Sequence, residues 1–234
     1  MSIFRFKHFQ VNQSETPMKV GTDGVLLGAW TRIEPTDRRI LDLGTGTGVI
    51  ALMMAQRAAE AEIWGVDIDS VEEARSNGDL SPWGARLHFR QTAVQAFEAE
   101  PFDLIVSNPP FFVESLRCPD RGRTMARHAV VLPFEELRDA VVRLLKPEGR
   151  FALVLPTTEA ERFVQLAAGR LQTIRRTEVC TTPRHAPKRT LLEMTHLASQ
   201  RPVEPVEELT IGTGEHETYT AEYRALTCDF YLKF

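Results

Sequence analysis

The stretch Arg39-Ile40-Leu41-Asp42-Leu43-Gly44-Thr45-Gly46-Thr47-Gly48 decides the fold of this chain. Its first half is mostly apolar and predicts a short buried strand over residues 39–43, and a helical pattern over residues 48–59 follows it. Glycines between a strand and a helix allow a tight turn and close backbone approach to a ligand, while the helix N-terminus offers unpaired N–H groups. A ligand-binding loop is therefore predicted, formed by Gly44, Thr45, Gly46 and Gly48.

The spacing of this loop, G-x-G-x-G after an acidic residue, differs from the G-x-G-x-x-G of dinucleotide sites. Asp42 would repel a pyrophosphate, but its carboxylate suits the amino group of a cationic nucleoside such as S-adenosylmethionine. A second predicted strand, residues 62–67, ends at Asp67, where an acid can hold both ribose hydroxyls. Asp67 and Ile68 are therefore predicted cofactor contacts. The alternative for Asp67 is the N-cap of a helix predicted near 70–80.

A third motif, Asn108-Pro109-Pro110-Phe111, follows an apolar strand predicted over residues 102–107. The exocyclic amine of adenine is a poor nucleophile because its lone pair is delocalised into the ring. The side-chain oxygen of Asn108 and the carbonyl of Pro109 can accept from the amine hydrogens, and the prolines fix φ and remove competing N–H donors. Phe111 would stack on the base. The motif predicts a catalytic loop; the alternative is a proline-stiffened turn.

With these motifs the chain resembles class I, Rossmann-like S-adenosylmethionine-dependent methyltransferases that act on amino groups and carry an N-P-P-aromatic signature. Residues 4–9, 18–30 and 123–128 narrow the resemblance to the bacterial family of tRNA1(Val) adenine-N6 methyltransferases, which modify the anticodon-loop adenine at position 37. This resemblance implies an α/β fold with a seven-stranded, mostly parallel sheet, helices on both faces and an antiparallel C-terminal hairpin. It also places Thr22 and Asp23 at the cofactor, Asp23 near the methionine end.

The sequence departs from the broad class after the third predicted strand, near residues 86–90. Many such enzymes place an Asp there for the adenine amine of the cofactor, whereas Ala93 occupies this position here. Ala93 and Val94 are therefore expected to hold that adenine by packing and backbone contacts. The same catalytic signature also serves rRNA guanine-N2 and protein glutamine-N5 methyltransferases, and a catalytically silent cofactor-binding RNA scaffold is the alternative from outside the enzymes.

The distribution of charge favours RNA as the partner. The net charge is −4, but residues 101–200 contain 15 basic and 11 acidic side chains. Phosphate binding depends on local patches rather than on total charge. Each basic residue taken singly could equally be a solvated surface residue, but as groups they favour contacts to the RNA backbone. The predicted RNA contacts are Arg117, Arg121, Arg123 and Arg127 after the catalytic loop, and Arg184, Lys188 and Arg189 near a late hairpin.

The remaining pattern fits one domain over residues 1–234, with an N-terminal extension (1–20) and a C-terminal tail (199–234) packed on it. Further helices are predicted at 22–33, 133–146 and 158–170, and further strands at 150–155, 173–181 and 189–197. No apolar run predicts a membrane span or a signal peptide, so a cytoplasmic location is expected. Three scattered cysteines suggest neither disulfides nor a metal site. A monomer is expected.

Overall fold

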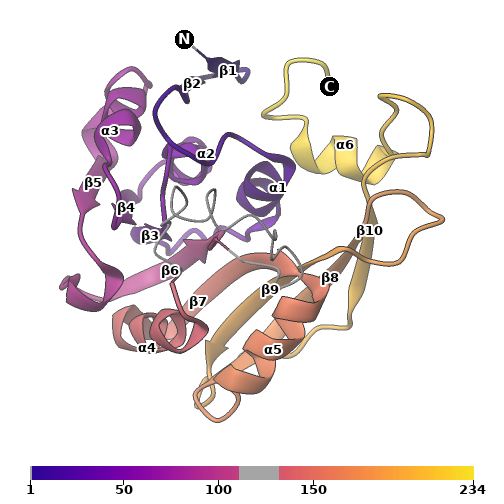
Figure 1. Ribbon diagram of the computed structural model, residues 1–234. Coiled ribbons are helices and arrows are strands. Elements are labelled where there is room, and N and C mark those ends of the chain that lie inside the picture. Colours follow the sequence, from indigo (N-terminus) through magenta and orange to yellow (C-terminus); the bar gives the residue numbers. More distant parts are fainter. Residues whose placement is uncertain (1, 111–131) are drawn as a thin grey trace, which may run out of the picture.

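The computed structural model describes residues 2–110 and 132–234, and in these it contains a central sheet of eight strands between two layers of helices (Figure 1). The strand order is β10-β8-β9-β7-β6-β3-β4-β5. The strands are β3 (Arg39–Leu43), β4 (Glu62–Asp67), β5 (Leu87–Gln91), β6 (Phe102–Ser107), β7 (Leu145–Pro156), β8 (Leu171–Cys180), β9 (Arg189–His196) and β10 (Glu207–Thr210).

The direction of the strands confirms the predicted doubly wound sheet. Strands β5, β4, β3, β6 and β7 are parallel neighbours, and β9 runs antiparallel to both β7 and β8. Strand β10 extends the seven predicted strands by pairing in parallel with the outer edge of β8. Its sequence, Glu-Glu-Leu-Thr, has one buried side chain, that of Leu209. A polar edge strand of this kind has little apolar pattern, so it was not predicted from the sequence.

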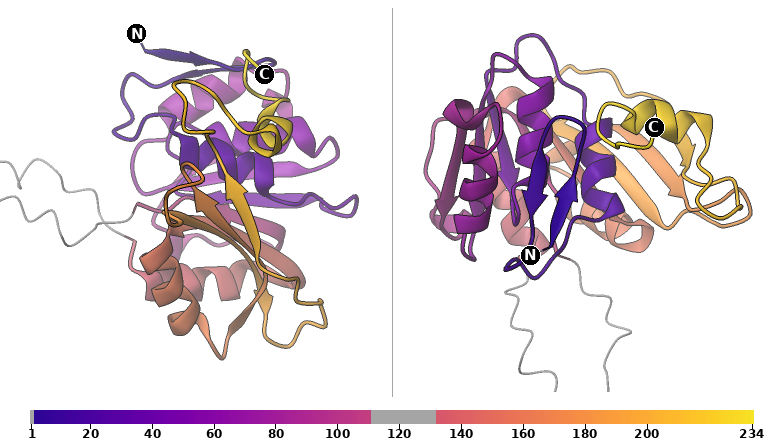
Figure 2. Two further views of the ribbon diagram at one scale, coloured as in Figure 1. Left: turned by 90° about the vertical axis from the view of Figure 1, so that its right-hand side faces the viewer. Right: turned by 90° about the horizontal axis from the view of Figure 1, so that it is seen from above.

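The helices are α1 (Thr22–Trp30), α2 (Val49–Arg57), α3 (Glu72–Asp79), α4 (Phe134–Leu144), α5 (Thr157–Ala167) and α6 (Ala221–Thr227). Helices α1, α2 and α3 cover one face of the sheet, and α4 and α5 cover the other (Figures 1 and 2). Alternate residues of each strand enter the two cores, because successive side chains point to opposite faces. Ile40 thus packs with the α1 and α2 layer, and Leu41 with the α4 and α5 layer. Within the described ranges, no helix is both long enough and apolar enough to cross a membrane.

Some boundaries differ from the predicted ones. The helix expected over residues 133–146 ends at Leu144, and the strand expected over 150–155 already begins at Leu145. Leu145 is buried and pairs with Phe102, after which the register of the two strands shifts. Leu145 therefore belongs to the sheet because it pairs with β6. This is an effect of tertiary packing, which local sequence patterns for helices do not predict.

The N-terminal and C-terminal segments pack against each other beside α1 and α2. Residues 3–12 form a hairpin of β1 (Ile3–Arg5) and β2 (Gln10–Asn12). At its turn, the Lys7 ammonium donates to the carbonyls of Cys228 and Phe234 at 2.7 and 2.8 Å, and the Lys7 N–H donates to the Phe230 carbonyl at 2.9 Å. Figure 2 shows the two ends of the chain on the same side of the molecule.

Candidate active site

The register of the parallel strands brings the predicted site residues to one edge of the sheet. Leu43 lies opposite Val66 on β4 and opposite Ser107 on β6. Adjacent strands are about 4.8 Å apart, so the residues that follow these positions emerge side by side. These residues are Gly44, Asp67 and Asn108. The carboxyl edge of a parallel sheet is also where open α/β proteins bind their ligands.

The glycine loop is anchored to the end of β4 by its backbone. The Val66 carbonyl accepts hydrogen bonds from the N–H groups of Gly44 and Thr45, at 2.8 and 3.1 Å. One carboxylate oxygen of Asp67 accepts from the Gly46 N–H at 2.8 Å. The loop conformation is therefore set by three of its own N–H groups, which donate to acceptors at the end of a single strand.

Left-handed backbone angles explain the spacing of the glycines. Gly44, Gly46 and Gly48 have φ values of +75°, +51° and +81°, a region that favours glycine. Gly48 is the N-cap of α2, and its N–H donates to the Thr45 carbonyl at 2.8 Å. The turn from β3 into α2 therefore depends on glycine at these positions.

Asp42 lies beneath the loop and is fully buried. One of its carboxylate oxygens accepts from the Thr45 hydroxyl at 2.8 Å and from the Ala51 N–H at 3.2 Å. The other, Oδ1, is buried and has no hydrogen-bond partner among the residues that the structure describes. Burial raises the pKa of Asp42 to about 7, since the desolvated carboxylate is poorly compensated.

Asp67 connects the glycine loop to the segment after β5. Its second carboxylate oxygen accepts from the Asp69 N–H at 3.0 Å, and its backbone carbonyl accepts from the Thr92 N–H at 2.8 Å. Burial raises its pKa. The contact with Thr92 brings the half-buried Ala93 and the buried Val94 to the same edge, where Val94 begins a short 3-10 turn, η2 (Val94–Ala96).

The segment after Asp67 leads from this edge into α3. Ile68, next to Asp67, is 44% exposed. The N-cap of α3 is Val71, whose side chain makes no capping hydrogen bond, and the N–H of Glu72 donates to the Ser70 hydroxyl at 3.4 Å. The alternative interpretation of Asp67 as a helix N-cap is therefore wrong.

Asn108 extends from the end of β6 toward α1. The Ser107 hydroxyl, buried, donates to the Leu43 carbonyl at 2.8 Å and so ties the end of β6 to the end of β3. A Cβ placed on Gly24 of α1 would lie 3.7 Å from the Asn108 amide nitrogen. Pro109 is buried and Pro110 half-buried. Ser107 and Gly24 were not singled out from the sequence, because their role depends on strand and helix neighbours that local patterns do not reveal.

The first turn of α1 is joined to the first residue of β9. Thr22 is exposed, whereas Asp23 accepts a hydrogen bond from the Arg189 guanidinium at 2.7 Å. Arg189 lies opposite Pro156, the last residue of β7, and is therefore at the same sheet edge as the glycine loop. The structure thus pairs a predicted cofactor residue with a predicted RNA residue.

The other predicted RNA residues fall into two groups. Arg184 and Lys188 are exposed in the connection between β8 and β9, at this same edge. The remaining predicted site residues lie outside the described residues: Phe111, Arg117, Arg121, Arg123 and Arg127. In the described part of the chain, no group of three or more His, Cys, Asp or Glu side chains is arranged to hold a metal ion.

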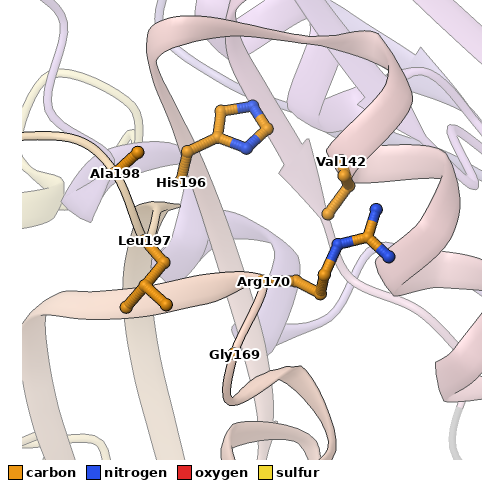
Figure 3. A pocket seen from close by; sticks show the side chains of 6 residues that line it. All are labelled: Val142, Gly169, Arg170, His196, Leu197 and Ala198. Carbon is orange, nitrogen blue, oxygen red and sulfur yellow. The ribbon is translucent and has the colours of Figure 1, made fainter.

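An open hollow of about 380 Å³ lies at the opposite edge of the sheet and contains none of the predicted residues. Figure 3 shows the side chains of Arg170 and His196 at this hollow, with Val142 and Leu197. His196 pairs with Leu171, the first residue of β8, which places the hollow at the amino end of that strand. It is therefore separate from the glycine loop.

Comparison with known proteins agrees with this geometry. Residues 19–178 match the family model of the methyltransferase small domain. A relative in Phocaeicola vulgatus, described as a tRNA1(Val) (adenine(37)-N6)-methyltransferase, is 45% identical over 98% of this chain and 97% of its own length. One with the same description in Tolumonas auensis is 42% identical over 98% of this chain and 97% of its own length.

Solved structures show the same fold at low sequence identity. A predicted O-methyltransferase from Agrobacterium tumefaciens has a TM-score of 0.67 and 18% identity, covering 89% of this chain and 96% of that chain. The glycopeptide N-methyltransferase MtfA, solved with S-adenosylmethionine, has a TM-score of 0.55 and 13% identity, covering 77% of this chain and all of that chain. The fold is therefore that of class I methyltransferases. Together with the near-full-length relatives, the matched domain shows that this chain belongs to the methyltransferase small-domain family and, within it, to the tRNA1(Val) (adenine(37)-N6)-methyltransferase family.

Proposed function

We propose that this chain transfers a methyl group from S-adenosylmethionine to the exocyclic N6 of an adenine in tRNA, namely adenine 37 of tRNA1(Val). The observation that carries the proposal is the position of Asn108 and Pro109 at the sheet edge that also bears the glycine loop and Asp67. The substrate follows from relatives of 42–45% identity over nearly the whole chain, whose descriptions name it.

The residues at the edge fit S-adenosylmethionine. A Cβ added to Gly44 would meet no atom within 4 Å, so the outer side of the loop is open where a ligand would lie. Oδ1 of Asp42, which lies beneath the loop without a hydrogen-bond partner among the described residues, can attract the positive charge of a ligand electrostatically. Asp67 remains available to ribose hydroxyls, since each of its oxygens has capacity for more than one donor. When bound, the cofactor supplies a methyl group activated by a sulfonium.

The acceptors at the end of β6 would prepare the amine for attack. Asn108 accepts one amine hydrogen with its side-chain oxygen, and the carbonyl of Pro109 accepts the other, so the nitrogen lone pair is directed along the line of transfer. Ser107 ties the end of β6 to the end of β3, and Asn108 lies beside Gly24 of α1. The base has to leave its stack to reach this pocket, a step common to enzymes that modify bases. Orientation of the two reactants would then supply much of the rate enhancement.

Contact with the RNA backbone is proposed for the connection between β8 and β9. Arg184 and Lys188 are exposed there, at the edge that carries Asn108. Arg189 would act from within the site, since its guanidinium is bound to Asp23. The arginines of residues 117–127 remain predicted RNA contacts.

The direct test of the function is methyl transfer from labelled S-adenosylmethionine to a tRNA1(Val) transcript. We expect the label in N6-methyladenosine after digestion, and no transfer to a transcript in which adenine 37 is replaced by guanine. Label in N2-methylguanosine, or on a protein glutamine instead of the tRNA, would contradict the proposal.

Cofactor affinity is expected to depend on pH through Asp42. The pKa of Asp42, about 7, lies above the ordinary value of 3.8. The folded state is therefore more stable at low pH, where Asp42 is protonated, and this contribution to stability is lost as the pH rises through 7. A cationic ligand instead favours the carboxylate, so binding should weaken by up to about tenfold per pH unit below pH 7. Calorimetry with S-adenosylmethionine between pH 6 and 8 measures this. In Asp42→Asn the affinity for S-adenosylmethionine should vary less with pH. If the affinity of that variant varied as steeply as in the wild type, the titrating group would be another one, such as Asp67.

Removal of the acceptor at Asn108 should affect the chemical step. We expect Asn108→Ala to slow single-turnover methyl transfer by about 10²–10³-fold, the loss typical of a group positioned for the transition state. Affinity for tRNA and cofactor should change little, because the interaction is made mainly in the transition state. Asn108→Asp keeps an acceptor and should retain more activity. Wild-type transfer rates in Asn108→Ala would remove this residue from the mechanism.

Charge reversal in the connection between β8 and β9 should reduce the salt dependence of tRNA binding. Arg184→Glu and Lys188→Glu should each lower the slope of log affinity against log salt by about 0.7–0.9, the amount that one phosphate interaction contributes. Arg162→Glu is the matched control, since that side chain is 63% exposed on α5. If Arg184→Glu and Lys188→Glu both keep the wild-type slope, as the control should, this connection does not bind the RNA.

A further inference from the structure

The buried carboxylate of Glu73, on α3, binds the segment that precedes α1. One oxygen accepts from the N–H groups of Ser14 and Glu15 at 2.6 and 3.0 Å. The other accepts from the N–H of Thr16 at 2.9 Å and from the Thr16 hydroxyl. Glu73 is 7% exposed. Burial alone would raise its pKa, but these hydrogen bonds outweigh burial and lower the pKa of Glu73, which indicates a charged acceptor.

Asn77, one turn further along α3, holds the same segment and the glycine loop together. Its oxygen accepts from the Asn12 N–H at 2.8 Å. Its nitrogen donates to the carbonyls of Asn12 and Thr47, both at 2.9 Å. Thr47 belongs to the glycine loop, and Asn77 is 1% exposed. One face of α3 therefore holds both the segment that precedes α1 and the glycine loop.

The segment also closes on itself. The side-chain oxygen of Gln13 accepts from the Val20 N–H at 2.7 Å. The Lys19 ammonium donates to the carbonyl of Gln13, and to that of Thr16 at 3.0 Å. We call residues 12–20 the strap. It leads from β2 to Gly21, the N-cap of α1.

The strap reaches the centre of the glycine loop. A Cβ built on Gly46 would lie 3.6 Å from the methyl group of Thr16, whose N–H and hydroxyl are both held by Glu73. Gly46 is also the residue whose N–H binds Asp67. The position of Thr16 against the loop is therefore set by Glu73. Residues 22 and 23, at the start of α1, follow the strap after Gly21.

We propose that Glu73 is a positioning residue of the cofactor site: it holds the strap against Gly46, and the strap forms one wall of the pocket above the glycine loop. Only a carboxylate suits this position, because it accepts four hydrogen bonds and donates none. A glutamine of the same shape would turn an NH₂ group toward the donors of the strap and leave some of them unpaired. The role of the strap in cofactor binding does not rest on the proposed function. Only the delivery of the methyl group to tRNA rests on it.

The experiment compares Glu73→Gln with Glu72→Gln in the full chain, using S-adenosylhomocysteine as the probe. Glu72 is the adjacent residue on α3, and its side chain is 70% exposed. Calorimetry should show affinity reduced by about tenfold or more in Glu73→Gln, as expected when hydrogen bonds to a charged group are removed, and unchanged in Glu72→Gln. Hydrogen exchange should show the amides of residues 14–16 losing protection in Glu73→Gln alone.

Kinetics separate positioning from a general structural defect. In Glu73→Gln the KM for S-adenosylmethionine should rise in proportion to the drop in affinity, while kcat at saturating cofactor stays within about twofold of the wild type. Thr16→Val removes only the hydroxyl hydrogen bond and should weaken probe binding in the same direction by a smaller factor. This variant decides the question if Glu73→Gln does not fold.

Two results would overturn the proposal: wild-type affinity for the probe in a folded Glu73→Gln, or loosened strap amides without any change in affinity. If Glu73→Gln does not fold, wild-type affinity in Thr16→Val has the same meaning. A wild-type protein that binds the probe but does not methylate tRNA would contradict the proposed function and leave the test of the strap intact.

Discussion

The site depends on the hydrogen bonds that tie the glycine loop to the end of β4. The Val66 carbonyl takes two N–H groups of the loop, and the Asp67 side chain takes a third. These bonds fix the position of the loop relative to the sheet. They therefore also fix the N–H groups at the N-terminus of α2 and the open side of Gly44. Because Leu43 on β3 lies opposite Ser107 on β6, Asn108 emerges beside the start of the glycine loop.

The parts that the sequence could predict are those in which structure follows from neighbours along the chain. The strand, glycine turn and helix around Asp42 form a local unit, and positive φ at Gly44, Gly46 and Gly48 explains why the motif is recognisable. The same holds for the strand that precedes Asn108. Predicted boundaries differed where a partner strand intervened, as at Leu145.

The parts that the sequence could not predict depend on contacts between distant residues. Asp23 and Arg189 are 166 residues apart, and the sequence assigns them to different ligands, whereas the structure joins them. Glu73 reaches the strap across 57–59 residues, and its i, i+4 partner Asn77 has the pattern of an ordinary polar position on a helix. No periodicity or local motif reports such pairs, because which surfaces meet is decided by the packing of whole layers.

Burial separates the charged residues at this edge of the sheet into two groups. Asp42 is buried and Asp67 is half-buried, so desolvation raises their pKa values and strengthens their effect on a cation. Arg184 and Lys188 lie in water at the same edge, where their fields reach a polyanion but are screened by salt. In the proposed function, these opposite charges would serve a cationic cofactor and an anionic substrate within one short span of the sheet.

The contacts of Lys7 have a consequence for the order in which the molecule is assembled. They join residues 221 and 227 positions apart, so they close nearly the largest loop that this chain can form. Such contacts are made late in folding, because the entropy of loop closure must be met before they contribute. The turn of the hairpin that leads into the strap is therefore expected to reach its final place only after residues 228–234 have packed beside it.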